Sequence, residues 1–245
     1  MKSAAIIEKY LEAYIRHLTI LPVTNKLKFS IVDGFSGGGL YKSLERQEIL
    51  GSPLRIIEAI ERLKRVIAFE RENNKIRQID FDVPVYCIEK NIATFKFLKR
   101  TLSQRELNHL VQTINGEFEK VYTNIIKELQ NKKYQKAIFL LDQYGYAEAN
   151  INSVKYILNS FKNAEIILTF ACDNLIDYLS IKNKTALLNL GLDNCDIEHL
   201  LDTKQDNDDN RKILQFILLK SIINKVGACY YTPFFIQGKK THKAY

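Results

Sequence analysis

Apolar positions along the chain follow two alternating patterns, one typical of helices and the other of buried strands. Residues 3–18 form the first amphipathic segment, in which Ile7, Leu11 and Leu18 fall on one stripe. Further helices are expected over residues 91–102, 118–129 and 152–161. Short apolar runs predict five strands, at Leu27–Phe35, Val83–Glu89, Leu110–Ile114, Ala137–Asp142 and Glu165–Phe170.

Ser52 and Pro53 mark the start of another helix. Serine is favoured as the N-cap and proline at the first helical position, so we expect the Ser52 side chain to cap this helix. Arg55 then lies on the first turn. It could contact a phosphate or pair with Asp33, and the sequence leaves both possibilities open.

This order of elements predicts an α/β fold. Strands that alternate with helices are typical of a mostly parallel sheet covered by helices on both faces, a three-layer Rossmann-like arrangement. In such sheets the ligand lies beyond the carboxyl ends of the strands, near the point where the strand order reverses. The residues directly after each strand are therefore the candidates for a site.

The region after the fifth strand has a different character. We expect a helical insertion near residues 174–226, with an exposed acidic loop over Asp202–Asn210 and an apolar helix over Ile213–Val226. Residues Ala228–Gln237 predict a strand antiparallel to the others. A basic segment after it begins a return strand at Lys243–Tyr245, so we expect a C-terminal piece of the natural chain to be missing.

We therefore interpret residues 1–245 as a single domain. Residues 1–24 form its N-terminal helix, residues 25–175 its Rossmann-like core, and residues 176–245 a helical segment with a final strand. A chain of 245 residues is long enough for one such core.

The first two predicted strands end in residues suited to a nucleoside. Asp33 is followed by a run rich in glycine over residues 34–39, which lets a backbone approach a ligand or simply forms a loop. Glu89 ends the second strand and suits the two hydroxyls of a ribose. Alternatively, Glu89 is a carboxylate that favours the start of the next helix.

The third and fourth strands end in an acid near an aromatic ring. Glu117 and Phe118 could hold an adenine by its amine and its face, or Glu117 is an ordinary first-turn acid. Asp142 and Tyr144 could hydrogen-bond an amine and stack on a planar base, or Asp142 stabilises a local turn. We favour a functional role for Asp142, because it directly follows a buried strand.

Composition narrows the class of protein. Hydrophobic residues make up 46% of the chain, which excludes a largely disordered protein, and no apolar run approaches the ~20 residues of a membrane span. The net charge of +8 favours nucleic acid as a partner, although lysine-rich chains from AT-rich genomes share it. The cysteines and histidines are scattered, which predicts neither disulfides nor a metal site. Because no disulfides are expected, we expect the protein in the reducing cytoplasm.

Together these residues resemble class I S-adenosylmethionine-dependent methyltransferases and, more narrowly, the three-Cys-motif partner (TcmP) family. The matching segments are residues 33–39, 51–55, 88–89, 116–117, 141–145 and 168–170, within a resemblance that spans roughly residues 25–175. The Gly-Ser-Pro-Leu-Arg segment at residues 51–55 is the most specific. The chain departs from the family's usual residues at Ser36–Gly38, Glu117 and Gln143.

The resemblance implies a role for each candidate. Gly37 and Gly39 would border the methionine portion of S-adenosylmethionine, with Asp33 near its ammonium group. Glu89 would hold the ribose and Glu117 the adenine amine. In full, it implies cofactor binding at Asp33, Phe35, Ser36, Gly37, Gly39, Glu89, Glu117 and Phe118, and catalysis at Asp142, Gln143 and Tyr144.

Two functions are therefore expected. The first is a cytoplasmic methyltransferase that uses S-adenosylmethionine on DNA or RNA, in a mobile-element or phage-defence system as the family resemblance implies. The second is the same fold used as a metal-dependent nuclease, since clustered carboxylates can hold Mg²⁺, or as a binding subunit without catalysis. The family resemblance also implies a partner protein with a three-cysteine motif.

Overall fold

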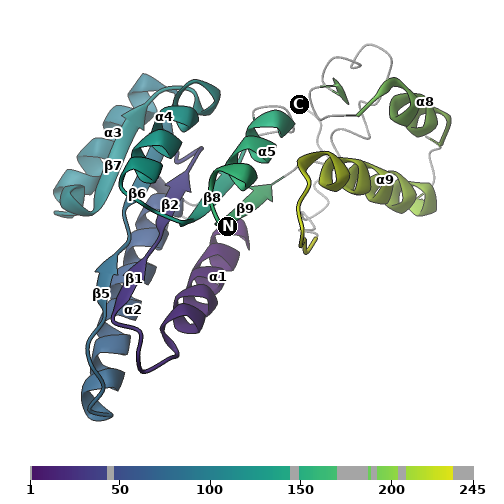
Figure 1. The fold of residues 1–245 in the computed structure, drawn as a ribbon. Coiled ribbons are helices and arrows are strands. Elements are labelled where there is room, and N and C mark those ends of the chain that lie inside the picture. The colour runs from purple at the N-terminus through teal and green to yellow at the C-terminus, as the bar shows by residue number, and fades with distance from the viewer. Residues whose placement is uncertain are drawn as a thin grey trace.

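A five-stranded parallel sheet forms the centre of the protein. The computed structural model describes residues 2–42, 47–143, 149–169, 187–188, 192–203 and 208–233. The strands lie in the order β7-β6-β2-β8-β9, and each neighbouring pair is parallel (Figure 1). Their bounds are β2 Ser30–Asp33, β6 Val85–Glu89, β7 Val111–Asn115, β8 Lys136–Asp142 and β9 Asn163–Thr169. The predicted α/β, Rossmann-like sheet is thus confirmed.

Helices cover both faces of the sheet because side chains along each strand point alternately to opposite sides. Ile31 packs with residues from α1 (Lys2–Thr19), α2 (Ser52–Asn73) and α3 (Ile92–Gln104). The next residue, Val32, packs with residues from α4 (Phe118–Asn131), α5 (Ile151–Ser160) and the end of α9 (Asp208–Val226). A short 3₁₀ helix, η1 (Asn108–Leu110), leads into β7.

The strand order reverses next to β2. From β2 the chain passes to β6 and β7 on one side, and then returns to β8 on the other side of β2. The connections that leave β2 and β8 therefore diverge from neighbouring strand ends, which is the place where open α/β sheets bind ligands. Asp33 and Asp142 end these two strands.

The first predicted strand is two strands in the structure. Residues Lys26–Lys28 form β1 beside β5 (Asp80–Asp82), whereas β2 pairs with β6. Pro84 separates β5 from β6 and has no backbone N–H to donate, which accounts for the interruption. The sequence also gave no indication of the small antiparallel pair β3 (Leu40–Lys42) and β4 (Glu48–Leu50).

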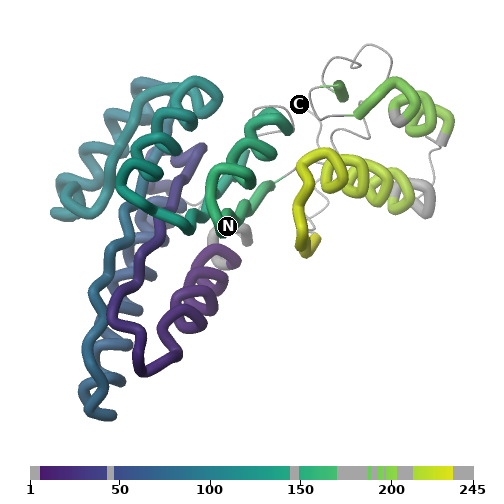
Figure 2. The backbone as a smooth tube through the Cα atoms, in the orientation of Figure 1, coloured from purple at the N-terminus to yellow at the C-terminus, as the bar shows by residue number. Residues whose placement is uncertain are grey.

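The helical character of the C-terminal region is confirmed in its described residues. Helices α8 (Asn194–Thr203) and α9 share an apolar cluster that includes Leu200, Leu214 and Leu218. They lie beyond the β9 end of the sheet, away from α3 (Figure 2). The expected loop over 202–210 is wrong at both ends, because α8 extends to Thr203 and α9 begins at Asp208, each anchored by this cluster.

The predicted C-terminal strand is wrong over residues 228–233, which form no strand. Tyr230 in this segment is 95% exposed, so its apolar pattern does not reflect pairing with the sheet. The rest of that prediction, and the return strand at 243–245, lie outside the described residues. None of the described helices is long and apolar enough to cross a membrane.

Candidate functional site at the carboxyl edge of the sheet

Three of the four predicted acids lie close together at the carboxyl edge, where the parallel strands end. Asp33 ends β2, Glu89 ends β6 and Asp142 ends β8. Burial first, and then the negative charges of all three carboxylates, raise the pKa of the Tyr41 hydroxyl. One phenol therefore lies within the electrostatic reach of all three acids, as expected from their positions on neighbouring strands.

The glycine loop, residues 34–39, folds over this edge. The Gly34 N–H donates to the Leu140 carbonyl (2.9 Å) and the Ser36 N–H to the Ile88 carbonyl (3.0 Å). The loop thereby bridges β8 and β6 above the end of β2. Gly37 has a φ of +60°, a conformation that side chains disfavour, so this turn depends on glycine.

Asp33 is fully buried beneath the glycine loop. Its carboxylate accepts hydrogen bonds from the Ser52 hydroxyl (2.6 Å) and, at 3.3 Å, from the Phe35 N–H. Burial raises the pKa of Asp33 to about 7, and the nearby charge of Asp142 acts in the same direction. Asp33 has no exposed surface, and its place near a ligand ammonium stays a prediction.

The Gly-Ser-Pro segment and the glycine loop are two parts of one site. The Gly51 N–H donates to the Gly39 carbonyl at 2.8 Å. A Cβ on Gly51 would lie 3.2 Å from the Gly39 backbone and 2.7 Å from Cε2 of Tyr41, so only glycine fits. The N-cap of α2 is Gly51, and Ser52 uses its hydroxyl on Asp33; the predicted Ser52 cap is therefore wrong.

Arg55 does not pair with Asp33. Its guanidinium donates to Glu8 on α1 and to the Leu50 carbonyl, both at 2.9 Å. Arg55 thereby joins α2 to α1 and to the end of β4. Of the two possibilities that the sequence left open, the ion pair with Asp33 is not formed, since Ser52 binds that carboxylate. A phosphate contact by Arg55 stays a prediction.

Glu89 serves the start of α3 with one of its oxygens. Its Oε1 accepts the N–H of Asn91 at 2.6 Å, and Asn91 in turn caps α3 by accepting the N–H groups of Ala93 and Thr94. The helix-entry role is thus present in the structure. Glu89 is half-buried at the carboxyl edge, so its predicted ribose contact stays compatible with this geometry.

Glu117 and Phe118 follow β7 where the Gly116 N–H donates to the Glu89 carbonyl at 3.1 Å and the Phe118 ring packs against Gly34. The Glu117 carboxylate pairs with Lys120 at 2.9 Å, and 55% of its side chain is exposed. Phe118 is only 3% exposed and stacks on Tyr122 with ring centroids 5.3 Å apart. The expectation of an open Phe118 ring face is corrected: this ring belongs to the core, beside Phe35.

Gln143 directly follows β8 and contacts Ala149 and the end of β9. Its amide oxygen accepts the Ala149 N–H at 2.9 Å, and its amide nitrogen donates to the Thr169 carbonyl at 3.3 Å. The side chain is buried and connects residues on either side of 144–148. These contacts favour a structural role over the predicted catalytic one. Tyr144 lies outside the described residues.

Tyr41 is the residue that sequence reasoning missed. It lies on β3, the residue is 49% exposed, and its hydroxyl oxygen lies against the Gly37 backbone. Nothing in the apolar pattern predicted β3, so its contact with the glycine loop could not be anticipated. The only local signal was its position two residues after the last glycine of the loop.

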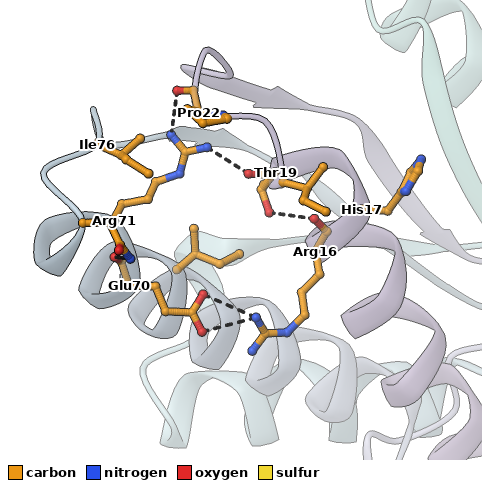
Figure 3. A pocket seen from close by; sticks show the side chains of 10 residues that line it. Arg16, His17, Thr19, Pro22, Glu70, Arg71 and Ile76 are labelled. Carbon is orange, nitrogen blue, oxygen red and sulfur yellow. Dashed lines mark hydrogen bonds and ion pairs between the residues drawn. The ribbon is translucent and has the colours of Figure 1, made fainter.

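A cavity of about 390 Å³ lies between α1, α2 and the turn after α1 (Figure 3). Arg71 is 5% exposed and donates to the carbonyls of Thr19 (2.9 Å), Thr24 (2.9 Å) and Arg77 (2.7 Å), among others. Arg16 pairs with Glu70 across the cavity at 3.3 Å. These polar groups hold the turn in place, so we interpret the cavity as structural.

Comparison with known proteins yields no identification. No protein-family model matches the chain, and no curated protein is significantly similar to it. Within the described residues, no group of three or more His, Cys, Asp or Glu side chains is arranged to hold a metal ion.

Proposed function

We propose that the protein is a class I methyltransferase-like protein that binds S-adenosylmethionine at the carboxyl edge and acts on nucleic acid. The observation that carries the proposal is the convergence of Asp33, Glu89 and Asp142 with the glycine loop at the reversal of strand order. The resemblance to the three-Cys-motif partner family, and with it a cytoplasmic phage-defence or mobile-element role, belongs to the same proposal.

The residues at this edge suit the proposed cofactor. S-adenosylmethionine carries an ammonium and a sulfonium cation, and the half-buried carboxylates of Glu89 and Asp142 offer negative charge on either side of the loop. The Tyr41 hydroxyl and the Phe97 ring lie against the Gly37 and Gly38 backbone, where a Cβ on either glycine would collide with them. When bound, the cofactor would supply an electrophilic methyl group.

The chain's own contribution would be to position the reactants. Glu89 would orient the ribose, and Asp142 would accept a hydrogen bond from the methyl acceptor at the end of β8. Alignment of a nucleophile with a methyl group depends chiefly on such orientation. Asp33 would act through the loop, since its oxygens are bound by Ser52 and by the Phe35 N–H.

Support for a nucleic-acid partner comes from α3, next to the glycine loop. Phe97 is 45% exposed, and its ring lies where a Cβ on Gly38 would come within 2.8 Å. The neighbouring Lys96, Lys99 and Arg100 are exposed on the same helix. An aromatic ring among basic side chains is a common arrangement in proteins that bind single-stranded nucleic acid, because the ring stacks on bases and the cations contact phosphates.

Two linked measurements test the proposal. Isothermal titration with S-adenosylmethionine and S-adenosylhomocysteine should show binding. Thermal unfolding with either ligand present should show a raised melting temperature. Labelled cofactor should then transfer its methyl group to DNA or RNA, and Asp142→Asn should slow transfer by roughly 100-fold. Asp80→Asn is the matched control, because Asp80 is exposed on β5 and pairs with Lys26.

Absence of both heat and thermal stabilisation at millimolar cofactor would refute cofactor binding. Binding without methyl transfer to either nucleic acid would refute catalysis and favour a binding subunit. Equal rates for Asp142→Asn and Asp80→Asn would refute the role of Asp142.

A further inference from the structure

The ring of Tyr41 is held against two glycines from different segments. Tyr41 lies opposite Ile49 in the β3–β4 pair. A Cβ on Gly51 would lie 2.7 Å from Cε2 of the ring, and a Cβ on Gly37 would collide with the hydroxyl oxygen. Tyr41 thus packs directly on the two glycines, while 49% of the residue stays exposed.

The Tyr41 hydroxyl is left with a proton to donate. Its oxygen lies against the Gly37 backbone, and a phenol O–H can donate one hydrogen bond. Burial and the surrounding carboxylates raise the pKa of the phenol, so it stays neutral and protonated over the physiological range. Tyr41 is therefore a neutral hydrogen-bond donor among negative charges.

An amino-acid ligand at this edge carries two groups of opposite charge. Its ammonium group is attracted by Glu89 and Asp142, but its own carboxylate is repelled by them. That carboxylate needs donors without a negative charge. The Tyr41 O–H, next to the Gly37 backbone, is a neutral donor that the described geometry brings to this place.

We propose that Tyr41 donates a hydrogen bond from its hydroxyl to the carboxylate of the amino-acid portion of S-adenosylmethionine. This inference rests on the proposed function. It makes Tyr41 a specificity-determining residue, one that favours a cofactor with a free carboxylate over an otherwise equal ligand without it. In this proposal the β3–β4 pair positions the Tyr41 hydroxyl next to the glycine loop.

The test compares Tyr41→Phe with wild type for two ligands, S-adenosylmethionine and its decarboxylated form, by isothermal titration. Loss of a hydrogen bond to a charged group should weaken S-adenosylmethionine binding by about tenfold or more, and binding of the decarboxylated ligand by less than about twofold. The variant keeps the ring, so its melting temperature should match wild type.

Tyr156→Phe is the matched control, since Tyr156 is also about half exposed, at 43%, but packs on Tyr122 of α4. It should change neither affinity. Equal losses for the two ligands in Tyr41→Phe, or no loss, would overturn the role of Tyr41 while leaving cofactor binding intact. If wild type binds neither ligand, the proposed function itself fails, and the inference with it.

Discussion

Replacing Asp33 by asparagine should stabilise the folded protein at neutral and alkaline pH. Asp33 is buried with no exposed surface, and its pKa rises from an ordinary 3.8 to about 7 in the folded protein. An asparagine can keep both contacts. Its oxygen can accept the Phe35 N–H, and its amide can donate to the Ser52 hydroxyl, which accepts as readily as it donates.

The sign of the pH dependence follows from proton binding. Between about pH 4 and about pH 7, the folded protein holds a proton on Asp33 that the unfolded chain has lost, so the free energy of unfolding falls as the pH rises through this range. The full cost, above pH 7, is on the order of 4 kcal/mol at about 1.4 kcal/mol per pH unit. Asp33→Asn has no such titration.

Urea unfolding at several pH values measures the effect. The advantage of Asp33→Asn over wild type should grow by about 2 to 3 kcal/mol between about pH 5 and about pH 8, or somewhat less if the site relaxes. Asp80→Asn controls for loss of a carboxylate at an exposed position, since its side chain is 69% exposed. An advantage that does not change with pH, or an Asp33→Asn protein less stable than wild type at pH 8, would refute this account of Asp33.

Three further predictions concern other parts of the structure. Gly51→Ala should lower the free energy of unfolding by about 1–3 kcal/mol, because its Cβ would meet a backbone and a ring; a urea titration measures this. Arg71→Ala should cost about 3 kcal/mol by leaving buried carbonyls without a donor, whereas Arg62→Ala, which loses an exposed ion pair, should cost less than about 1 kcal/mol. In a thiol-labelling assay read by peptide mass spectrometry, exposed Cys195 should react in the native protein, and Cys87 only on unfolding, since burial and the charge of Asp33 raise the pKa of its thiol.

Each of these has a clear contrary result. A Gly51→Ala protein as stable as wild type would mean that the ring and loop move aside freely. If Arg71→Ala and Arg62→Ala lower the free energy of unfolding equally, the buried Arg71 does not hold the turn in place. Rapid labelling of Cys87 in the native state would show that the carboxyl edge opens to solvent.

The sequence alone was sufficient to predict the central sheet and its covering helices. Apolar runs and helical stripes identified the five sheet strands and the helices between them, because burial on a face repeats at short intervals along the chain. The same logic placed Asp33, Glu89 and Asp142 at one edge, since parallel strands connected by helices end on the same side.

What the sequence could not determine were the partners of the side chains. Ser52 was expected to cap a helix and instead binds Asp33. For Arg55 the sequence left a phosphate and Asp33 open as partners, and in the structure it binds Glu8. For both side chains, the possible partners were chemically equivalent. Which partner lies within hydrogen-bond distance depends on how distant segments pack in the fold.

Tyr41 shows the same limit most clearly. A strand of three residues has too little periodicity to be detected, and its position over the glycine loop depends on the pairing of β3 with β4. Local patterns in a chain set its helices and strands, because those depend on neighbours a few residues away. Which residues meet at the carboxyl edge depends on segments tens of residues apart, and only the packed tertiary structure decides that.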